Sequence, residues 1–167
     1  MVKKKIVIVF GGAGLIGSAL MRSMSLNKKY KLINLDLNIK KNMLINFKCN
    51  VLNEKQTENR IKQITHKYGK IYGVINATYP KVIQKKSPGK INPNLFTREI
   101  SNHLKSFFNT TQIMCNYFKK KKIEGRIINL ASIYGEFIPR IEIYKGTNIS
   151  APMQYLISKN SLITMTK

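Results

Sequence analysis

Acidic residues are scarce in this chain of 167 residues, which has seven of them against 30 lysines and arginines and a formal net charge of +23. Such a charge attracts polyanions. However, only five of the basic residues are arginines, the type that reads bases and phosphates with paired hydrogen bonds. The lysines are scattered, and no aromatic interleaving among them marks a platform for nucleic acid. We therefore expect solvated lysine faces that attract anionic small molecules, and no specific nucleic-acid partner.

Cysteine is equally rare, and Cys49 and Cys115 lie too far apart to match a metal-binding or redox motif. Both fall in segments with an apolar periodicity, so we predict two buried free thiols, no metal site and a reducing compartment, the cytoplasm.

Long hydrophobic runs are also lacking, and no stretch is long enough to span a bilayer. The start of the chain, with Lys3–Lys5 before an apolar run, imitates a secretory signal peptide. The regular glycines inside that run, followed by a second apolar segment that ends in Asp, fit a strand–helix–strand unit better. We predict a protein without a membrane partner.

Hydrophobic residues make up 43% of the chain, enough for a core, and apolar β-branched runs alternate with helical periodicities. This alternation predicts an α/β fold with a three-layer, doubly wound parallel sheet of the Rossmann type, in strand order 3-2-1-4-5, within one domain over residues 1–167. The predicted strands are Lys5–Phe10, Tyr30–Asp36, Phe47–Val51, Ile71–Ala77 and Arg126–Ser132. The predicted helices are Leu15–Met24, Glu54–Tyr68, Asn92–Lys121 and Met153–Thr166. In the third helix an apolar stripe should pack on the sheet, formed by Ile100, Leu104, Phe107, Thr111, Met114 and Phe118.

A glycine-rich segment directly follows the first predicted strand and opens a helix. It satisfies both GxGxxG and GxxGxxG, and its residues are Gly11, Gly12, Ala13, Gly14, Leu15, Ile16 and Gly17. Glycine allows the tight turn, the close approach of backbone to a pyrophosphate and the packing of helix on strand. The helix N-terminus then offers amide N–H groups to the phosphates.

The only aspartate of the chain, Asp36, lies 19 residues after Gly17, at the end of the second predicted strand. At this place a carboxylate accepts hydrogen bonds from the adenosine ribose of NAD. We therefore predict NAD as the cofactor. Lys40 and Lys41 could instead bind a 2′-phosphate, which keeps NADP as the alternative.

A second motif, Tyr155-Leu-Ile-Ser-Lys159, places two side chains on one face of the last helix. Together with the glycine-rich segment, it makes the whole chain resemble the short-chain dehydrogenase/reductase family. The resemblance implies that Tyr155 is the general acid/base. It also implies that Lys159 lowers the pKa of Tyr155 and, with it, contacts the cofactor. A free phenol, with a pKa of about 10, needs such a cation to work as a base near neutrality.

Other family positions are matched one by one. Ser132 matches the serine that binds the substrate oxygen, and Asn76-Ala77 and Asn50-Val51 match cofactor contacts, with Thr78 where glycine is usual. His103, beside Asn102, stands where the family has a catalytic asparagine, and we expect it to relay protons or hold water.

Ser132 precedes Tyr155 by 23 residues, a wider gap than in the compact members of the family. The extended members, sugar-nucleotide epimerases and dehydratases, share this gap, the GxxGxxG segment and a stretch like Ser132-Ile-Tyr-Gly135. The connection 133–147 and the stretch Asn76–Pro80 resemble one compact subgroup more closely, the oxidoreductases of flagellin modification and surface-polysaccharide synthesis. This subgroup implies a sugar-like substrate, with Arg140 and Tyr144 as candidate contacts in the connection, which could equally be a plain solvated loop.

Family members continue with two further strands, so this chain looks truncated at its C-terminus. The prediction is therefore an NAD(P)(H)-dependent oxidoreductase acting on an alcohol or carbonyl of a sugar-like substrate. The alternatives are an epimerase or dehydratase, and a catalytically silent dinucleotide-binding fragment. The two long helices resemble those that form family homodimers and homotetramers.

Overall fold

The computed structural model describes residues 4–39, 45–80, 92–147 and 152–167. The chain forms two compact units. The first comprises Met1–Tyr79 and Ser106–Leu130, and the second comprises Pro80–Lys105 and Ala131–Lys167. Helix α3 (Pro93–Lys121) runs through both.

The first unit contains a five-stranded parallel sheet in the order β3-β2-β1-β4-β5, which confirms the predicted fold and topology. Its strands are β1 (Lys5–Phe10), β2 (Tyr30–Asp36), β3 (Asn46–Lys48), β4 (Ile71–Asn76) and β5 (Arg126–Asn129). Strands β1, β2 and β4 are apolar and mostly buried, as strands covered on both faces must be.

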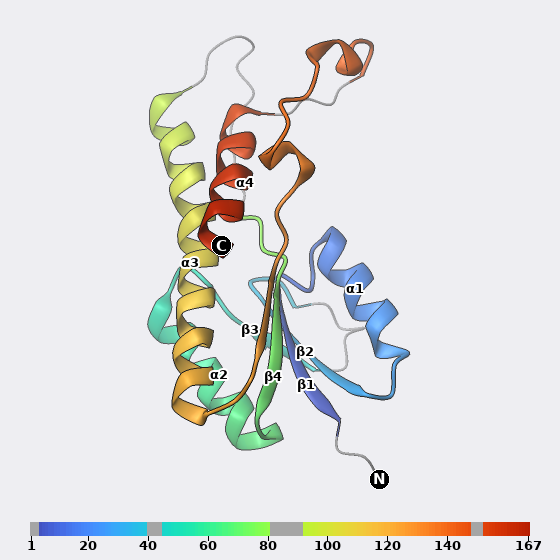
Figure 1. Cartoon of the computed structure of the whole chain (residues 1–167), viewed down its shortest axis with the longest axis vertical. Coiled ribbons are helices and arrows are strands. Elements are labelled where there is room, and N and C mark those ends of the chain that lie inside the picture. Colours follow the sequence, from blue (N-terminus) through green and yellow to red (C-terminus); the bar gives the residue numbers. More distant parts are fainter. Residues whose placement is uncertain (1–3, 40–44, 81–91, 148–151) are drawn as a thin grey trace. The chain divides into compact units, whose positions relative to one another are not determined.

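Helices cover both faces of this sheet, which gives the first unit three layers (Figure 1). Alternate residues of β1 divide between the two cores, because successive side chains of a strand point to opposite faces. Val7 and Val9 pack in the cluster of α1 (Leu15–Ser25). Ile8 and Phe10 pack in the cluster that contains residues of α2 (Glu54–Tyr68) and of the C-terminal part of α3.

Three strands end earlier than predicted. The range Ile71–Ala77 loses only Ala77, whereas Phe47–Val51 becomes Asn46–Lys48 and Arg126–Ser132 becomes Arg126–Asn129. β3 ends at Lys48, and a turn follows in which Asn50 accepts a hydrogen bond from Leu52 N, 3.0 Å away. β5 ends at Asn129, and Ser132 caps the short 3-10 helix η1 (Ile133–Gly135). In both places a polar side chain that bonds the nearby backbone ends the extended structure earlier than the apolar pattern indicates.

The buried face of α3 changes character along the helix. Phe107, Met114 and Phe118 are buried, as predicted, whereas Ile100 and Leu104 are only half-buried. The side chains of Glu99 and His103 are buried instead. The predicted apolar stripe is therefore wrong in the first half of α3, since periodicity finds an apolar face but not the side that packs.

Cys49 is buried, and burial raises the pKa of its thiol. Cys115 is exposed on α3, so the prediction of a second buried thiol is wrong. The reason is the same as for the apolar stripe: the periodicity does not show which side of the helix packs. Position 115 lies beside the buried stripe rather than on it.

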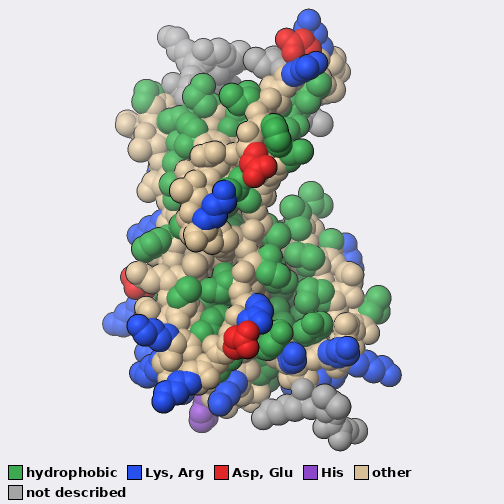
Figure 2. Space-filling model, viewed as in Figure 1, with side chains coloured by type: hydrophobic (Ala, Val, Ile, Leu, Met, Phe, Trp, Pro, Cys, Tyr) green, Lys and Arg blue, Asp and Glu red, His purple; other side chains and the backbone are tan. Residues whose placement is uncertain are grey.

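Basic side chains dominate the charged surface. Figure 2 shows many lysine and arginine side chains on one face of the molecule and few acidic ones. Within the described residues one ion pair forms, between Arg126 and Glu124 at 2.7 Å, and both partners are exposed. No helix in the described ranges is long and apolar enough to cross a membrane.

The second unit holds α4 (Met153–Thr166), η1, a second short 3-10 helix η2 (Ile141–Tyr144) and the N-terminal part of α3. η1 lies directly on α4, because a Cβ at Gly135 would come within 2.7 Å of the Lys159 carbonyl oxygen. This unit carries the second set of predicted site residues.

Candidate active site

The turn after β1 needs its glycines for distinct reasons. Gly11 has a φ of +79°, which L side chains rarely adopt. A Cβ at Gly12 would collide with the side chain of Asn34, and a Cβ at Gly17 would collide with the Gly11 carbonyl oxygen. The segment therefore folds tightly against β2 and lets α1 start at once.

Gly14 is less crowded, because a Cβ there would meet one backbone atom closely instead of colliding with several. The only atom within 4 Å of that position is the Gly11 carbonyl oxygen, at 3.2 Å. Gly14 is also the N-cap of α1 and supplies no side-chain cap to the first N–H groups of the helix. These groups and the positive end of the helix dipole form a cradle for an anion.

Two large apolar side chains stand at the mouth of this cradle. Leu15 is 91% exposed and Ile16 is 58% exposed, both in the first turn of α1. Exposed apolar side chains next to an anion cradle suit a ligand that joins a charged part to a planar ring.

Asp36 lies next to the glycine-rich segment. Its carboxylate accepts a hydrogen bond from Ala13 N at 2.9 Å and another from Asn38 N at 2.9 Å. The side chain is half-buried at the end of β2, so it remains accessible from one side. Lys40 and Lys41, the candidates for a 2′-phosphate, lie outside the described residues.

The predicted contacts after β3 and β4 also belong to the first unit. Val51 is buried, and its carbonyl oxygen accepts a hydrogen bond from Asn109 Nδ2 at 3.2 Å. Asn50, which precedes it, is held by its own hydrogen bonds to Leu52 N and Gln56 Oε1. This arrangement ties the turn after β3 to α3.

Asn76 and Ala77 stand at the end of β4, beside the glycine-rich turn. Ala77 N donates to the Phe10 carbonyl at 2.9 Å, and a Cβ at Gly11 would lie 2.8 Å from the Ala77 carbonyl. Asn76 Nδ2 donates to Asn129 Oδ1 at 2.5 Å. All predicted cofactor contacts except Tyr155 and Lys159 therefore fall in the first unit.

The four predicted catalytic residues, His103, Ser132, Tyr155 and Lys159, all fall in the second unit. The Lys159 ammonium lies 5.7 Å from the centre of the Tyr155 ring, one turn earlier on α4. Ser132 is half-buried, and its Oγ accepts a hydrogen bond from Tyr134 N at 3.2 Å. The Ser132 proton is left to donate to another acceptor.

Burial shifts the two basic groups of this unit. It lowers the pKa of Lys159 to about 8, so the side chain is mostly an ammonium at neutral pH. Burial, and then the charge of Lys159, lower the pKa of His103 to about 4, so the imidazole is neutral at pH 7. A neutral imidazole has one nitrogen that donates a proton and one that accepts.

Sequence reasoning missed three features around these residues. Buried Glu99 accepts a hydrogen bond from Gln154 Nε2 at 3.0 Å, directly before Tyr155. The hydroxyls of Tyr134 and Tyr144 lie 3.0 Å apart. Asn109 binds the turn after β3. Glu99 had a usable signal: in a chain with seven acidic residues, a glutamate one turn before His103 on the same helix face stands out.

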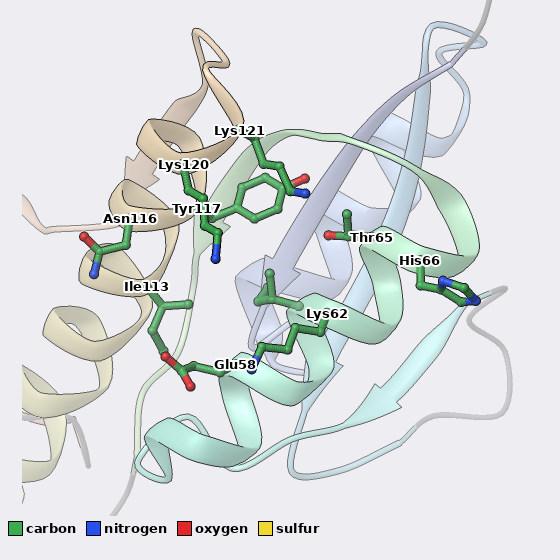
Figure 3. Close-up of a pocket in the computed structure, with 10 residues that line it drawn as sticks. Glu58, Lys62, Thr65, His66, Ile113, Asn116, Tyr117, Lys120 and Lys121 are labelled. Atoms are coloured by element: carbon green, nitrogen blue, oxygen red, sulfur yellow. The ribbon is translucent and has the colours of Figure 1, made fainter.

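A groove elsewhere in the first unit holds none of the predicted residues (Figure 3). It has a volume of about 560 Å³ and lies between α2 and α3. Its lining comprises Glu58, Ile61, Lys62, Thr65, His66, Ile113, Asn116, Tyr117, Lys120 and Lys121. Ile61 and Ile113 are already 96% and 92% buried, as their exposures of 4% and 8% show, so a ligand would gain little apolar contact here. The described residues contain no cluster of three metal-binding side chains.

Comparison with known proteins points to one family. A family model for short chain dehydrogenases matches residues 5–147. The chain is 29% identical to post-translational flagellin modification protein A of Campylobacter coli over an aligned length of 177 residues. The alignment covers 95% of this chain and 67% of the relative. This relative agrees with the flagellin-modification subgroup that the connection and the Asn76–Pro80 stretch resemble.

Solved structures show the same fold. A short chain dehydrogenase of Leptospira borgpetersenii, with bound NAD⁺, superposes with a TM-score of 0.82 at 24% identity and covers 98% of this chain and 63% of its own. Aldohexose dehydrogenase of Thermoplasma acidophilum superposes with a TM-score of 0.75 at 21% identity, with 98% and 59% covered. The chain thus spans between 59% and 67% of the length of these three proteins.

Proposed function

We propose, from the premise that this chain belongs to the short chain dehydrogenase family, that it is an NAD(H)-dependent oxidoreductase for a sugar-like alcohol or carbonyl. Tyr155 acts as the general acid/base. The observation that carries this proposal is the buried ammonium of Lys159, 5.7 Å from the Tyr155 ring. A cation in this position favours the phenolate, the form that can accept a proton.

The first unit supplies the cofactor contacts. The bare backbone at Gly14 and the uncapped N–H groups of α1 fit a pyrophosphate, and Asp36 fits the two ribose hydroxyls of the adenosine. The same carboxylate would repel a 2′-phosphate, which favours NAD over NADP. When bound, the nicotinamide accepts or supplies a hydride.

The second unit supplies the proton chemistry. In the oxidising direction the substrate alcohol loses a hydride from carbon, and the Tyr155 phenolate accepts its hydroxyl proton, which leaves a carbonyl. Ser132 donates a hydrogen bond to the same oxygen, and Lys159 stabilises the phenolate. His103, neutral at pH 7, passes the proton on or holds the water that does.

The substrate class rests on the relatives. The flagellin modification protein and the aldohexose dehydrogenase are named for modification of flagellin and for oxidation of a sugar. We propose a sugar-like substrate for this chain as well. We further propose that the protein works in the cytoplasm, that both units form one nucleotide-binding domain, and that the chain assembles into a homodimer or homotetramer. Buried Cys49, kept as a free thiol, suits a reducing compartment.

Replacement of Tyr155 by Phe tests the catalytic part. NADH binding, followed by its fluorescence, should change less than about threefold, because the phenol is not part of the phosphate cradle. Turnover of an aldohexose panel with NAD⁺ should fall by about 10²–10⁴-fold, because the acid/base group is gone. NADH binding without measurable turnover in the unaltered protein would favour a silent dinucleotide-binding module. Turnover that is unchanged in the variant would contradict the role of Tyr155, and turnover without net NADH release would favour an epimerase.

Replacement of Asp36 by Asn tests the cofactor part. The amide oxygen can still accept from Ala13 N, which holds the glycine-rich turn, whereas the bond from Asn38 N and the charge that binds the ribose are lost. We expect NADH to bind about 10–100-fold more weakly and NADPH to bind more tightly, because the repulsion of its 2′-phosphate is removed. Glu54→Gln, at the exposed start of α2, is the matched control for removal of one acidic charge. Equal affinities of the Asp36 variant and the unaltered protein for both cofactors would contradict the assignment.

A further inference from the structure

The segment after β5 is fixed on the helix that carries Tyr155. Ser132 Oγ caps η1 by accepting from Tyr134 N. Asn160 Nδ2 on α4 donates to the Gly135 carbonyl at 2.7 Å, and a Cβ at Gly135 would come within 2.7 Å of the Lys159 carbonyl oxygen. η1 therefore has one position on α4, and Tyr134 is held with it.

The connection then returns to the same place. η2 brings Tyr144 back, and its hydroxyl donates to the Tyr134 hydroxyl at 3.0 Å, although ten residues separate the two. Both side chains are half-buried. One proton serves the bond between them, so the pair still offers a second O–H donor and free lone pairs to a ligand.

This hydroxyl pair lies in the same unit as Tyr155, and its Tyr134 belongs to the segment that is bonded to the helix of Tyr155. The pKa of Tyr144 is raised, first by the hydrogen bond to Tyr134, then by burial and by the negative charges that Tyr134 and Tyr155 would carry. The Tyr144 hydroxyl thus stays protonated and able to donate at neutral pH. Three phenol groups are gathered in one unit, and only Tyr155 has a role in the proposed reaction.

We infer that the Tyr134–Tyr144 pair binds a second hydroxyl group of the substrate, next to the carbon on which Tyr155 acts. The pair therefore selects polyhydroxylated substrates over simple alcohols and over deoxy analogues. Hydroxyls that both donate and accept, on stiff aromatic rings, match the mixed donor and acceptor character of a sugar hydroxyl. This inference rests on the proposed function and names the residues that recognise the substrate.

The test compares aldohexoses with their 2-deoxy and 3-deoxy counterparts in the NAD⁺-linked assay, with Tyr134→Phe and Tyr144→Phe variants. For the unaltered protein, kcat/KM should be at least about tenfold higher for the hydroxylated sugar than for one deoxy form, because a lost hydrogen bond leaves a polar group unmatched. Each variant should lose about tenfold on the full sugar and less than about threefold on that deoxy form. Tyr30→Phe, in β2 of the first unit, is the matched control and should alter neither value.

Other outcomes overturn the inference. If both variants lower kcat/KM equally on hydroxylated and deoxy sugars, the pair only holds the connection in place. If simple ketones are reduced with NADH but no sugar is turned over, the inference fails while the oxidoreductase remains. If NADH does not bind at all, the proposed function itself fails. Thermal unfolding of each variant identifies any that does not fold. If one of the two Phe variants fails to fold, the kcat/KM values of the other decide whether the pair binds the hydroxyl.

Discussion

His103 is a buried imidazole in a strongly basic protein, and its protonation links the site to stability. Its pKa falls from 6.5 to about 4 on folding, by burial first and then by the charge of Lys159. Between pH 6.5 and 4 the unfolded chain therefore binds more protons at this position than the folded chain. The free energy of unfolding must decrease as the pH falls through this range.

Urea unfolding at pH 7, 6, 5 and 4 checks this for the unaltered protein and His103→Asn. Relative to the variant, the unaltered protein should lose up to about 3 kcal/mol of unfolding free energy between pH 7 and 4. Lys159 stays an ammonium throughout, and the Glu99 carboxylate, one turn away on α3, is common to both proteins. His66→Asn removes the other histidine, which is exposed on α2, and should not reproduce the effect. A pH-independent difference would contradict the burial of a neutral imidazole.

At the residue scale, sequence reasoning succeeded where a residue type is rare and its place is set by an element. Asp36 is the only aspartate and ends a strand whose range was predicted to the residue, so its position beside the glycine-rich turn could be foreseen. The Tyr134–Tyr144 contact could not, because ten residues of irregular chain separate the two and no periodicity relates them.

In the turn between β1 and α1, one glycine is needed for folding and another for cofactor binding. At Gly17 the space is filled by the protein's own backbone, and a Cβ would collide with the Gly11 carbonyl oxygen, whereas at Gly14 the same oxygen would be 3.2 Å away, a close contact that a small shift can relieve. Gly14→Val should therefore leave the fold intact, with a loss of unfolding free energy of about 1 kcal/mol, but weaken NADH binding at least about 100-fold by filling the cradle. NADH fluorescence titration and urea unfolding measure both quantities.

Gly17→Val is the matched variant for the same turn. Its side chain would collide with the backbone of Gly11 and Gly12, so it should lower the unfolding free energy by about 1–3 kcal/mol or more. If the Gly14→Val variant bound NADH as tightly as the unaltered protein does, the assignment of this turn as the phosphate cradle would be wrong.

Element ranges were predicted to the residue for two buried strands and two helices. β1, β2, α2 and α4 begin and end at the predicted residues. β3 and β5 are short, and asparagine and serine side chains end them by bonding the backbone, which hydropathy does not register. In α3 the face that packs depends on the tertiary structure, so half of the predicted stripe was misplaced.

The charge of the whole molecule follows from composition alone, but its effect on the surface does not. With so few acidic residues, most basic side chains have no acidic partner within reach, and the described part of the chain forms one ion pair. Mutual repulsion therefore opposes the compact state and weakens with added salt. The same positive field favours the approach of a negatively charged dinucleotide.

One helix belongs to both compact units, since α3 contributes its first half to one and its second half to the other. Helix formation is cooperative, because the first turn is costly and each further turn is gained cheaply. Loss of structure around His103 would therefore begin to unfold the same helix whose second half carries the buried residues Phe107, Met114 and Phe118. A ligand that binds the folded form of either unit raises that unit's free energy of unfolding.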